Sequence, residues 1–202
     1  CPRAETVNRY GAIVPSTIPH SARAPTVTVK RPCGSSTDFW SSSVGKLRHD
    51  GFLKGFGIKN NNKQIACTGN GQGQTAPSQT AMENCLQKNG KINVVYTINE
   101  PSAKGAWNAL KNAGKTKAAT TIVSVDGGCA GVRNVRAGII DATSQQYPLL
   151  MASRGVQAVV NYARTGKKVS GYTDTGVNLI TSRRRLGVPS KSVAYGLRNC
   201  WG

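Results

Sequence analysis

The stretch Ile92-Asn93-Val94-Val95-Tyr96-Thr97-Ile98-Asn99-Glu100-Pro101 decides the fold class, because an apolar run passes directly into polar residues. The same change from apolar to polar recurs where Thr120–Val125 meets Asp126-Gly127-Gly128, and where Gly138–Thr143 meets Ser144–Pro148. Between the first two runs lies a helix-like segment, residues 103–113, closed by Gly114. Strand, helix and strand at this spacing predict a parallel α/β sheet flanked by helices.

The carboxyl ends of these predicted strands carry hydrogen-bonding side chains. In open α/β sheets, ligands bind just beyond the carboxyl ends of the strands. Here those ends offer Asn99, Asp126, Gln145 and Gln146. Amides and a carboxylate suit a neutral, hydroxyl-rich ligand. Helix capping by Asn99 and Asp126 is the alternative interpretation. The two interpretations are compatible for neighbouring residues, because one residue can cap the helix while the next one faces the ligand.

Composition limits the function classes. The 202 residues can bury one good core. The net charge of +19 comes from 27 basic and 8 acidic residues, which raises a basic nucleic-acid or polyanion-binding protein as the alternative function. The basic residues are scattered, Arg183-Arg184-Arg185 is a short cluster, and aromatic residues are not interleaved with it. No specific nucleic acid is therefore expected as a partner. No run approaches the ~18–20 apolar residues of a membrane span.

Cysteine and histidine usage argues against a metal site. Six cysteines stand at positions 1, 33, 67, 85, 129 and 200 without a C-x-x-C pair, and His20 and His49 are too few and too far apart for metal binding. An even cysteine count in a glycine-rich chain suggests an exported protein with disulfides. Buried reduced thiols are the alternative.

Motifs for cofactors and catalysis are weak. The segment Gly69–Gly73 has a misplaced third glycine for a dinucleotide fingerprint, so no cofactor is expected. No serine lies in a nucleophile elbow. Glu100 and Asp126 could form a glycosidase pair, but Glu100 precedes Pro101 and is better explained as a cap of the following helix. The chain is not expected to be an enzyme.

The expected organisation is an irregular arm over residues 1–24, an α/β ligand-binding lobe over 25–171, and a hinge or return segment with a C-terminal tail over 172–202. Further predicted elements are strands at 25–30, 64–68 and 177–180 and helices at 39–56, 79–87 and 148–164.

Several motifs in order resemble one known family. They are Gly51–Gly57, Ala81–Asn84, Val95–Pro101, Val123–Cys129, Ala142–Ala152, Asp174–Val177 and Cys200-Trp201-Gly202. Over about residues 48–202 the chain resembles the sugar-binding proteins of bacterial ABC importers, in particular type I periplasmic binding proteins of the ribose/fructose type. The resemblance implies one lobe of such a protein, mainly the second, with its return segment. The first lobe has no counterpart in this sequence, so a truncated or partial form is expected.

The resemblance also implies function. It implies non-catalytic binding of a monosaccharide, a pentose or a hexose, for ABC-type import, with the importer's membrane subunits as partners and a periplasmic or exported location. By motif, the ligand-binding residues would be Arg48, Asn99, Asp126 and Gln146. A LacI-type effector domain shares the fold, but no helix-turn-helix precedes the lobe.

Two disulfides are predicted. Cys129 follows a strand-end loop, where it would pin the terminal Cys200-Trp201-Gly202, and Cys67 is the candidate partner of Cys85.

Overall fold

The computed structural model describes residues 26–27, 43–184 and 186–202. Within them lies a six-stranded sheet of order β2-β1-β3-β4-β5-β6. Its strands are β1 (Thr26–Val27), β2 (Ile65–Cys67), β3 (Val94–Tyr96), β4 (Thr121–Asp126), β5 (Ala142–Gln145) and β6 (Asn178–Thr181). Strands β1 to β5 run parallel, whereas β6 pairs antiparallel with β5. The predicted parallel sheet is confirmed, with one antiparallel strand at its edge.

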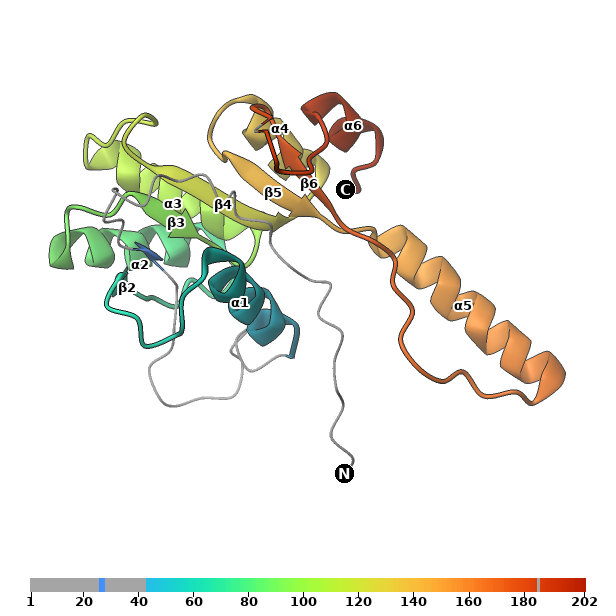
Figure 1. Cartoon of the computed structure of the whole chain (residues 1–202). Coiled ribbons are helices and arrows are strands. Elements are labelled where there is room, and N and C mark those ends of the chain that lie inside the picture. The colour runs from blue at the N-terminus through green and yellow to red at the C-terminus, as the bar shows by residue number, and fades with distance from the viewer. Residues whose placement is uncertain (1–25, 28–42, 185) are drawn as a thin grey trace.

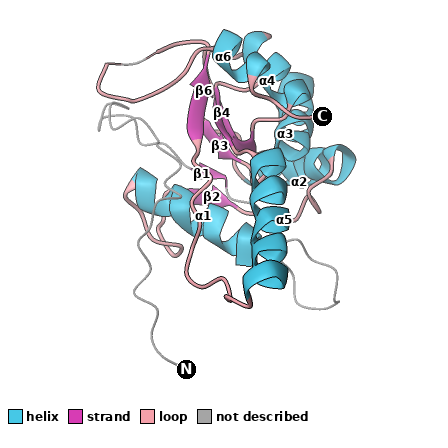
Figure 2. Cartoon of the chain, turned by 90° about the vertical axis from the view of Figure 1, so that its right-hand side faces the viewer, coloured by secondary structure: helices cyan, strands magenta, loops and turns pink. Residues whose placement is uncertain are grey.

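The helices of the described residues are α1 (Ser43–Phe56), α2 (Thr75–Lys88), α3 (Glu100–Asn112), α4 (Cys129–Arg136), α5 (Pro148–Thr165) and α6 (Val193–Arg198). All of them except α5, which projects away, lie along the two faces of the sheet (Figure 1). Helix α1 packs on one face, and α2 and α3 pack on the other. In the view from the side, α1 lies across the sheet from α2 and α3 (Figure 2). None of the helices in the described ranges is long and apolar enough to cross a membrane.

Strand alternation divides the core into two clusters. On β3, Val94 and Tyr96 face α1, and the Tyr96 ring stacks on Phe52 with centroids 4.2 Å apart. Val95, between them, faces the other side, where it packs with residues of α2, α3 and β4 such as Leu110. Both faces are apolar because a parallel sheet buried by helices on both sides has no solvated face.

Helices α2 and α3 approach each other closely at Gly105. A Cβ built on Gly105 would lie 2.1 Å from the Thr75 carbonyl oxygen and 2.8 Å from the Gln79 nitrogen. The missing side chain therefore allows the two helix backbones to meet, and this packing fixes the start of α3 beside the carboxyl end of β3.

Several element boundaries differ from the predictions. Helix α2 begins at Thr75 instead of Gln79, and α4 and α6 were not predicted. The strand predicted at 138–143 is β5 at 142–145, because Gly138 takes a φ of +71° after α4 and the following Ile140 is fully buried in the core. The predicted start of α1 at Phe39, the arm at 1–24 and residues 28–30 of the first strand lie outside the described residues.

Helix α5 extends away from the sheet, and the chain after it returns as an extended segment (Figure 1). Helix α5 is closed by Gly166, whose φ is +67°. No residue of α5 is buried, and Leu149, Val156 and Val159 are 74%, 65% and 68% exposed. The beginning of this helix and the end of the return segment reach the site described next.

Candidate functional site

Asp126 is the last residue of β4 and lies at the carboxyl edge of the sheet. Its φ of +137° is a backbone conformation that side-chain-bearing residues rarely adopt. The turn continues through Gly127, where an added Cβ would come within 2.3 Å of the Gln145 side chain. The glycine is needed here because β5 passes directly beside the turn. This turn fixes the position of the Asp126 carboxylate.

Arg48 on α1 connects the ends of two strands. Its guanidinium donates to the Ile98 carbonyl at 2.9 Å and forms an ion pair with the Asp126 carboxylate at 2.9 Å. The two side chains are 14% and 15% exposed. Partial burial strengthens this charge-assisted contact relative to one in water. The basic residue and the acidic residue predicted for the site therefore lie side by side.

Gln146 completes this group. Its Nε2 donates to the Asp126 carboxylate at 3.0 Å. Residues two apart on a strand share one face, and accordingly Ser144 and Gln146 both line a cavity of about 290 Å³. The other lining residues are mostly apolar and come from α1, β4, the start of α5 and the return segment: Val44, Leu47, Arg48, Val125, Met151, Tyr172, Gly176 and Val177.

Asn99 occupies a different place from the other three predicted residues. It is the N-cap of α3: its side-chain oxygen accepts from the Ser102 N–H at 3.1 Å, and its Nδ2 donates to the Gly73 carbonyl at 2.8 Å. Only 9% of the residue is exposed. The structure brings Arg48, Asp126 and Gln146 together, while the Asn99 amide is hydrogen-bonded to the backbone beside α3.

Glu100 has a role that sequence reasoning missed. The prediction that it caps the following helix is wrong, because Asn99 is the cap. The buried Glu100 carboxylate instead accepts from the N–H groups of Gly127 at 2.9 Å and Gly128 at 3.1 Å, and from the Thr143 hydroxyl at 2.6 Å. No local sequence signal links Glu100 to residues so far along the chain.

Burial controls the protonation of both acids. It raises the pKa of Asp126, and the neighbouring Arg48 opposes that effect. The pKa of Glu100 is raised to about 7, chiefly by burial and also by the Asp126 charge, against the hydrogen bonds from Thr143 and the glycine amides. The partner of Asp126, Arg48, is cationic and lines the cavity, whereas the donors to Glu100 within the described residues are neutral.

Gln145 is a second residue that sequence reasoning did not assign. It is fully buried, and its Nε2 donates to the carbonyls of Gly127 at 2.9 Å and Gly196 at 3.0 Å. It therefore ties the Asp126 turn to α6. The alternation of a strand was the available signal: if Gln146 faces the ligand side, Gln145 must face the opposite side.

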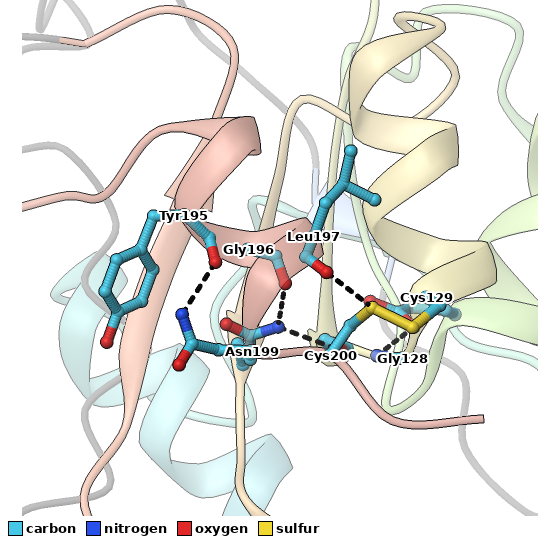
Figure 3. The surroundings of a disulfide bond; sticks show 10 residues. Gly128, Cys129, Tyr195, Gly196, Leu197, Asn199 and Cys200 are labelled. Carbon is cyan, nitrogen blue, oxygen red and sulfur yellow. Dashed lines mark hydrogen bonds between the residues drawn. A yellow bond between two sulfur atoms is a disulfide. The ribbon is translucent and has the colours of Figure 1, made fainter.

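The two predicted disulfides are present. Cys67 and Cys85 join β2 to α2, with Cα atoms 5.5 Å apart. Cys129 and Cys200 join the start of α4 to the C-terminal segment, with Cα atoms 4.9 Å apart (Figure 3). The Cys129 N–H also donates to the Trp201 carbonyl at 3.0 Å. The second disulfide thus holds the chain end against the turn that follows Asp126.

Comparison with known proteins gives a family match over residues 39–168, to the family described as the periplasmic binding protein domain. The chain is 34% identical over 86 residues to a D-allose-binding periplasmic protein of Escherichia coli strain K12, an alignment that covers 43% of this chain and 27% of the relative. It is 32% identical over 99 residues to a ribose import binding protein of Haemophilus influenzae, which covers 49% of this chain and 32% of the relative.

Solved structures agree on the fold. An ABC transporter periplasmic solute-binding protein from Actinobacillus succinogenes, with bound D-allose, superposes with a TM-score of 0.64 at 19% identity, covering 78% of this chain and 53% of that one. The chain thus spans about half the length of this structure and about a third or less of the two relatives. Since the family match covers more than half of the sequence, the chain belongs to the periplasmic binding protein domain family.

Proposed function

We propose that this chain binds a monosaccharide, without chemical conversion, at the cavity beside Arg48, Asp126 and Gln146. The observation that carries the proposal is the hydrogen-bonded group itself. Asp126 is held by Arg48 and by Gln146, and both of these also line the cavity of about 290 Å³. Asn99, the fourth residue implied by the resemblance, remains part of the proposed ligand-binding set.

The polar groups at the cavity suit a sugar: Arg48 and Gln146 line it, and the Asp126 carboxylate is bonded to both. A carboxylate accepts from two hydroxyls, a guanidinium donates in a planar fork, and an amide does both. The apolar walls, including Leu47 and Tyr172, offer a surface to the C–H faces of a sugar ring. The cavity is at the small end of the range for ligand sites. The names of the relatives, which specify D-allose and ribose, support a monosaccharide and leave its identity among pentoses and hexoses.

The position of Glu100 argues against the glycosidase alternative. A glycosidase needs two carboxyl groups that flank a bound sugar. The Glu100 carboxylate is turned into the protein, where it accepts three hydrogen bonds from neutral donors. The nucleic-acid or polyanion alternative is also disfavoured, because the family and the named relatives concern periplasmic binding and sugars.

The wider setting follows from the family. Membership implies a periplasmic location, and we propose that the membrane subunits of an ABC importer are the partners. We further propose that residues 25–171 form the ligand-binding lobe and that 172–202 act as hinge or return segment. In support, Tyr172, Gly176 and Val177 line the cavity, and β6 then adds to the sheet as its antiparallel edge.

Calorimetry with matched variants tests the proposal. D-allose, D-ribose and D-fucose are titrated into the chain, into Asp126→Asn and into the control Glu83→Gln. Asparagine tolerates the left-handed conformation of position 126, and Glu83 lies on α2 beside Gln79. We expect Asp126→Asn to weaken binding by about 1–3 kcal/mol, because it removes a charged acceptor, and Glu83→Gln to leave it unchanged.

Salt dependence separates the two function classes. Sugar binding through neutral hydroxyls should hardly change with added salt, whereas polyanion binding falls steeply. Tight, salt-sensitive binding of RNA or DNA, with no heat from any sugar of the panel, would overturn the proposed function and leave the fold unaffected.

A further inference from the structure

The turn that carries Asp126 is held from both sides by buried side chains. Its two N–H groups, from Gly127 and Gly128, donate to the Glu100 carboxylate, and the Gly127 carbonyl accepts from Gln145. Glu100 lies at the start of α3, so a side chain that follows β3 holds the backbone of the turn between β4 and α4. Glu100 is not among the residues that line the cavity, and it reaches the site through this turn.

Close packing fixes the Glu100 carboxylate in this place. A Cβ built on Gly131 of α4 would lie 1.8 Å from its carboxyl carbon, and a Cβ on Gly128 would lie 3.5 Å from Oε2. The Thr143 hydroxyl from β5 closes the remaining side at 2.6 Å. The carboxylate therefore occupies a space left by a glycine, at the N-terminus of α4, where the helix dipole favours negative charge.

We propose that Glu100 is the positioning residue of the candidate site: its carboxylate holds the Asp126 turn in the conformation that presents Asp126 to the ligand, and protonation of Glu100 lowers ligand affinity. This inference rests on the proposed sugar site and adds its regulation by pH. The reason is geometric. A protonated carboxyl group carries a hydrogen on one oxygen and loses its charge, so it accepts less strongly from the two glycine N–H groups. The hydrogen bonds by which Glu100 holds the N–H groups of Gly127 and Gly128 are then weakened.

The ionisable surroundings place this change near neutral pH. The pKa of Glu100 is raised by burial to about 7. Among the described charged groups, Asp126 acts directly on it and contributes to this rise, and Arg48 reaches the same turn through Asp126. Thr143 and the amides of Gly127 and Gly128 are neutral, and the nearby Cys129 and Cys200 are joined in a disulfide and do not titrate. Acidification through about pH 7 should therefore protonate Glu100.

The first test needs no ligand. Amide resonances and hydrogen exchange of Gly127 and Gly128 are followed by NMR between about pH 8 and about pH 6 in the full chain, in Glu100→Gln and in the control Glu83→Gln. We expect both amides to titrate near pH 7 and to lose protection at low pH in the chain and in the control. In Glu100→Gln they should be unprotected and independent of pH. Amides that do not respond to pH in the unchanged chain would overturn the proposal, and this result does not depend on whether the variant folds.

The second test measures affinity for whichever sugar of the D-allose, D-ribose and D-fucose panel binds. Affinity of the unchanged chain should fall about tenfold between these pH values, the equivalent of about one hydrogen bond, while Glu100→Gln should bind weakly at both. A Glu100→Gln variant that keeps full affinity, or keeps the pH dependence, would assign the effect to Asp126 and overturn the inference while the sugar site stands. If the turn amides titrate as expected and no sugar binds, the proposed function fails, and Glu100 still positions Asp126.

Discussion

At the scale of single residues, the candidate site depends on which hydrogen-bond or ion-pair partner each polar side chain has. Arg48 and Gln146, which line the cavity, both bind the Asp126 carboxylate, and Asn99 and Glu100 bind backbone groups. Tyr96 differs from all of them. It is 1% exposed, burial raises its pKa, and its hydroxyl has no hydrogen-bond partner among the described residues.

Tyr96→Phe should therefore stabilise the protein. The substitution removes a buried hydroxyl that has no partner in the described part of the chain, and it keeps the ring that stacks on Phe52 at 4.2 Å. An unsatisfied buried polar group costs about 1–3 kcal/mol, so a gain of about 1 kcal/mol in the free energy of unfolding is expected. Urea unfolding of the two proteins measures it. A clear loss of stability would show that the hydroxyl makes a contact that matters.

Glu100 should make stability depend on pH. Burial raises its pKa from 4.5 to about 7, so the folded chain binds this proton more tightly than the unfolded chain does. The resulting stabilisation is complete below about pH 4.5 and is lost as the pH rises through about 7. Glu100→Gln should flatten this part of the profile of unfolding free energy against pH. The profile of Glu83→Gln should follow the unchanged chain, and a Glu100→Gln profile that does the same would contradict the assignment.

At the scale of helices and strands, close backbone contacts position the site. Gly105 allows α3 to meet α2, and Gly155 lies on the projecting α5, where a built Cβ meets nothing within 4 Å. Gly105→Ala should cost about 2–3 kcal/mol, since overpacking forces the two backbones apart. Gly155→Ala should add about 0.5–1 kcal/mol, because alanine favours a helix. Thermal unfolding followed by circular dichroism measures both, and equal effects of the two substitutions would contradict the packing described here.

The two disulfides should contribute unequally. Cys129–Cys200 spans 71 residues and Cys67–Cys85 spans 18. In the chain-entropy model these loops correspond to about 4 and about 3 kcal/mol. Replacing Cys129 and Cys200 by serine should therefore lower the urea midpoint more than replacing Cys67 and Cys85. The reverse order would indicate that the terminal segment contributes little to the fold.

Sequence patterns predicted the elements whose signals are local. The apolar runs that end at Asn99 and Asp126 predicted strands β3 and β4, and Gly166 predicted the end of α5. The position of Cys129 after a strand-end loop predicted its disulfide with Cys200. The short helices α4 and α6 were missed, since each offers less than the three turns from which a periodic pattern can be recognised. The role of Glu100 was missed because its partners are 27, 28 and 43 residues away.

At the scale of the whole molecule, the charge of +19 is the dominant feature. Basic residues at the helix C-termini and in the loops gather at the amino edge of the sheet, away from the site: Lys88, Lys91, Lys111, Lys115, Lys117, Arg133 and Arg136. Asp141 pairs with Lys117 at this edge. The surplus of like charges repels itself in the compact state.

Added salt should therefore stabilise the fold. Raising sodium chloride from about 20 mM to about 300 mM shortens the Debye length from about 20 Å to about 6 Å, which screens repulsion among separate basic groups more than the partly buried pair of Arg48 and Asp126. The urea midpoint should rise across this range. A midpoint that falls would mean that surface ion pairs outweigh the net repulsion.

The central claim is that a monosaccharide occupies the cavity beside Asp126. It is tested most directly by NMR titration of the full chain with D-allose, D-ribose and D-fucose, with side-chain resonances of Arg48, Gln146 and Tyr172 assigned. Binding at the proposed site predicts saturable shifts at these three residues, unchanged by added salt and absent in Asp126→Asn. Saturable shifts confined to other parts of the molecule, or no shift with any sugar of the panel, would contradict it.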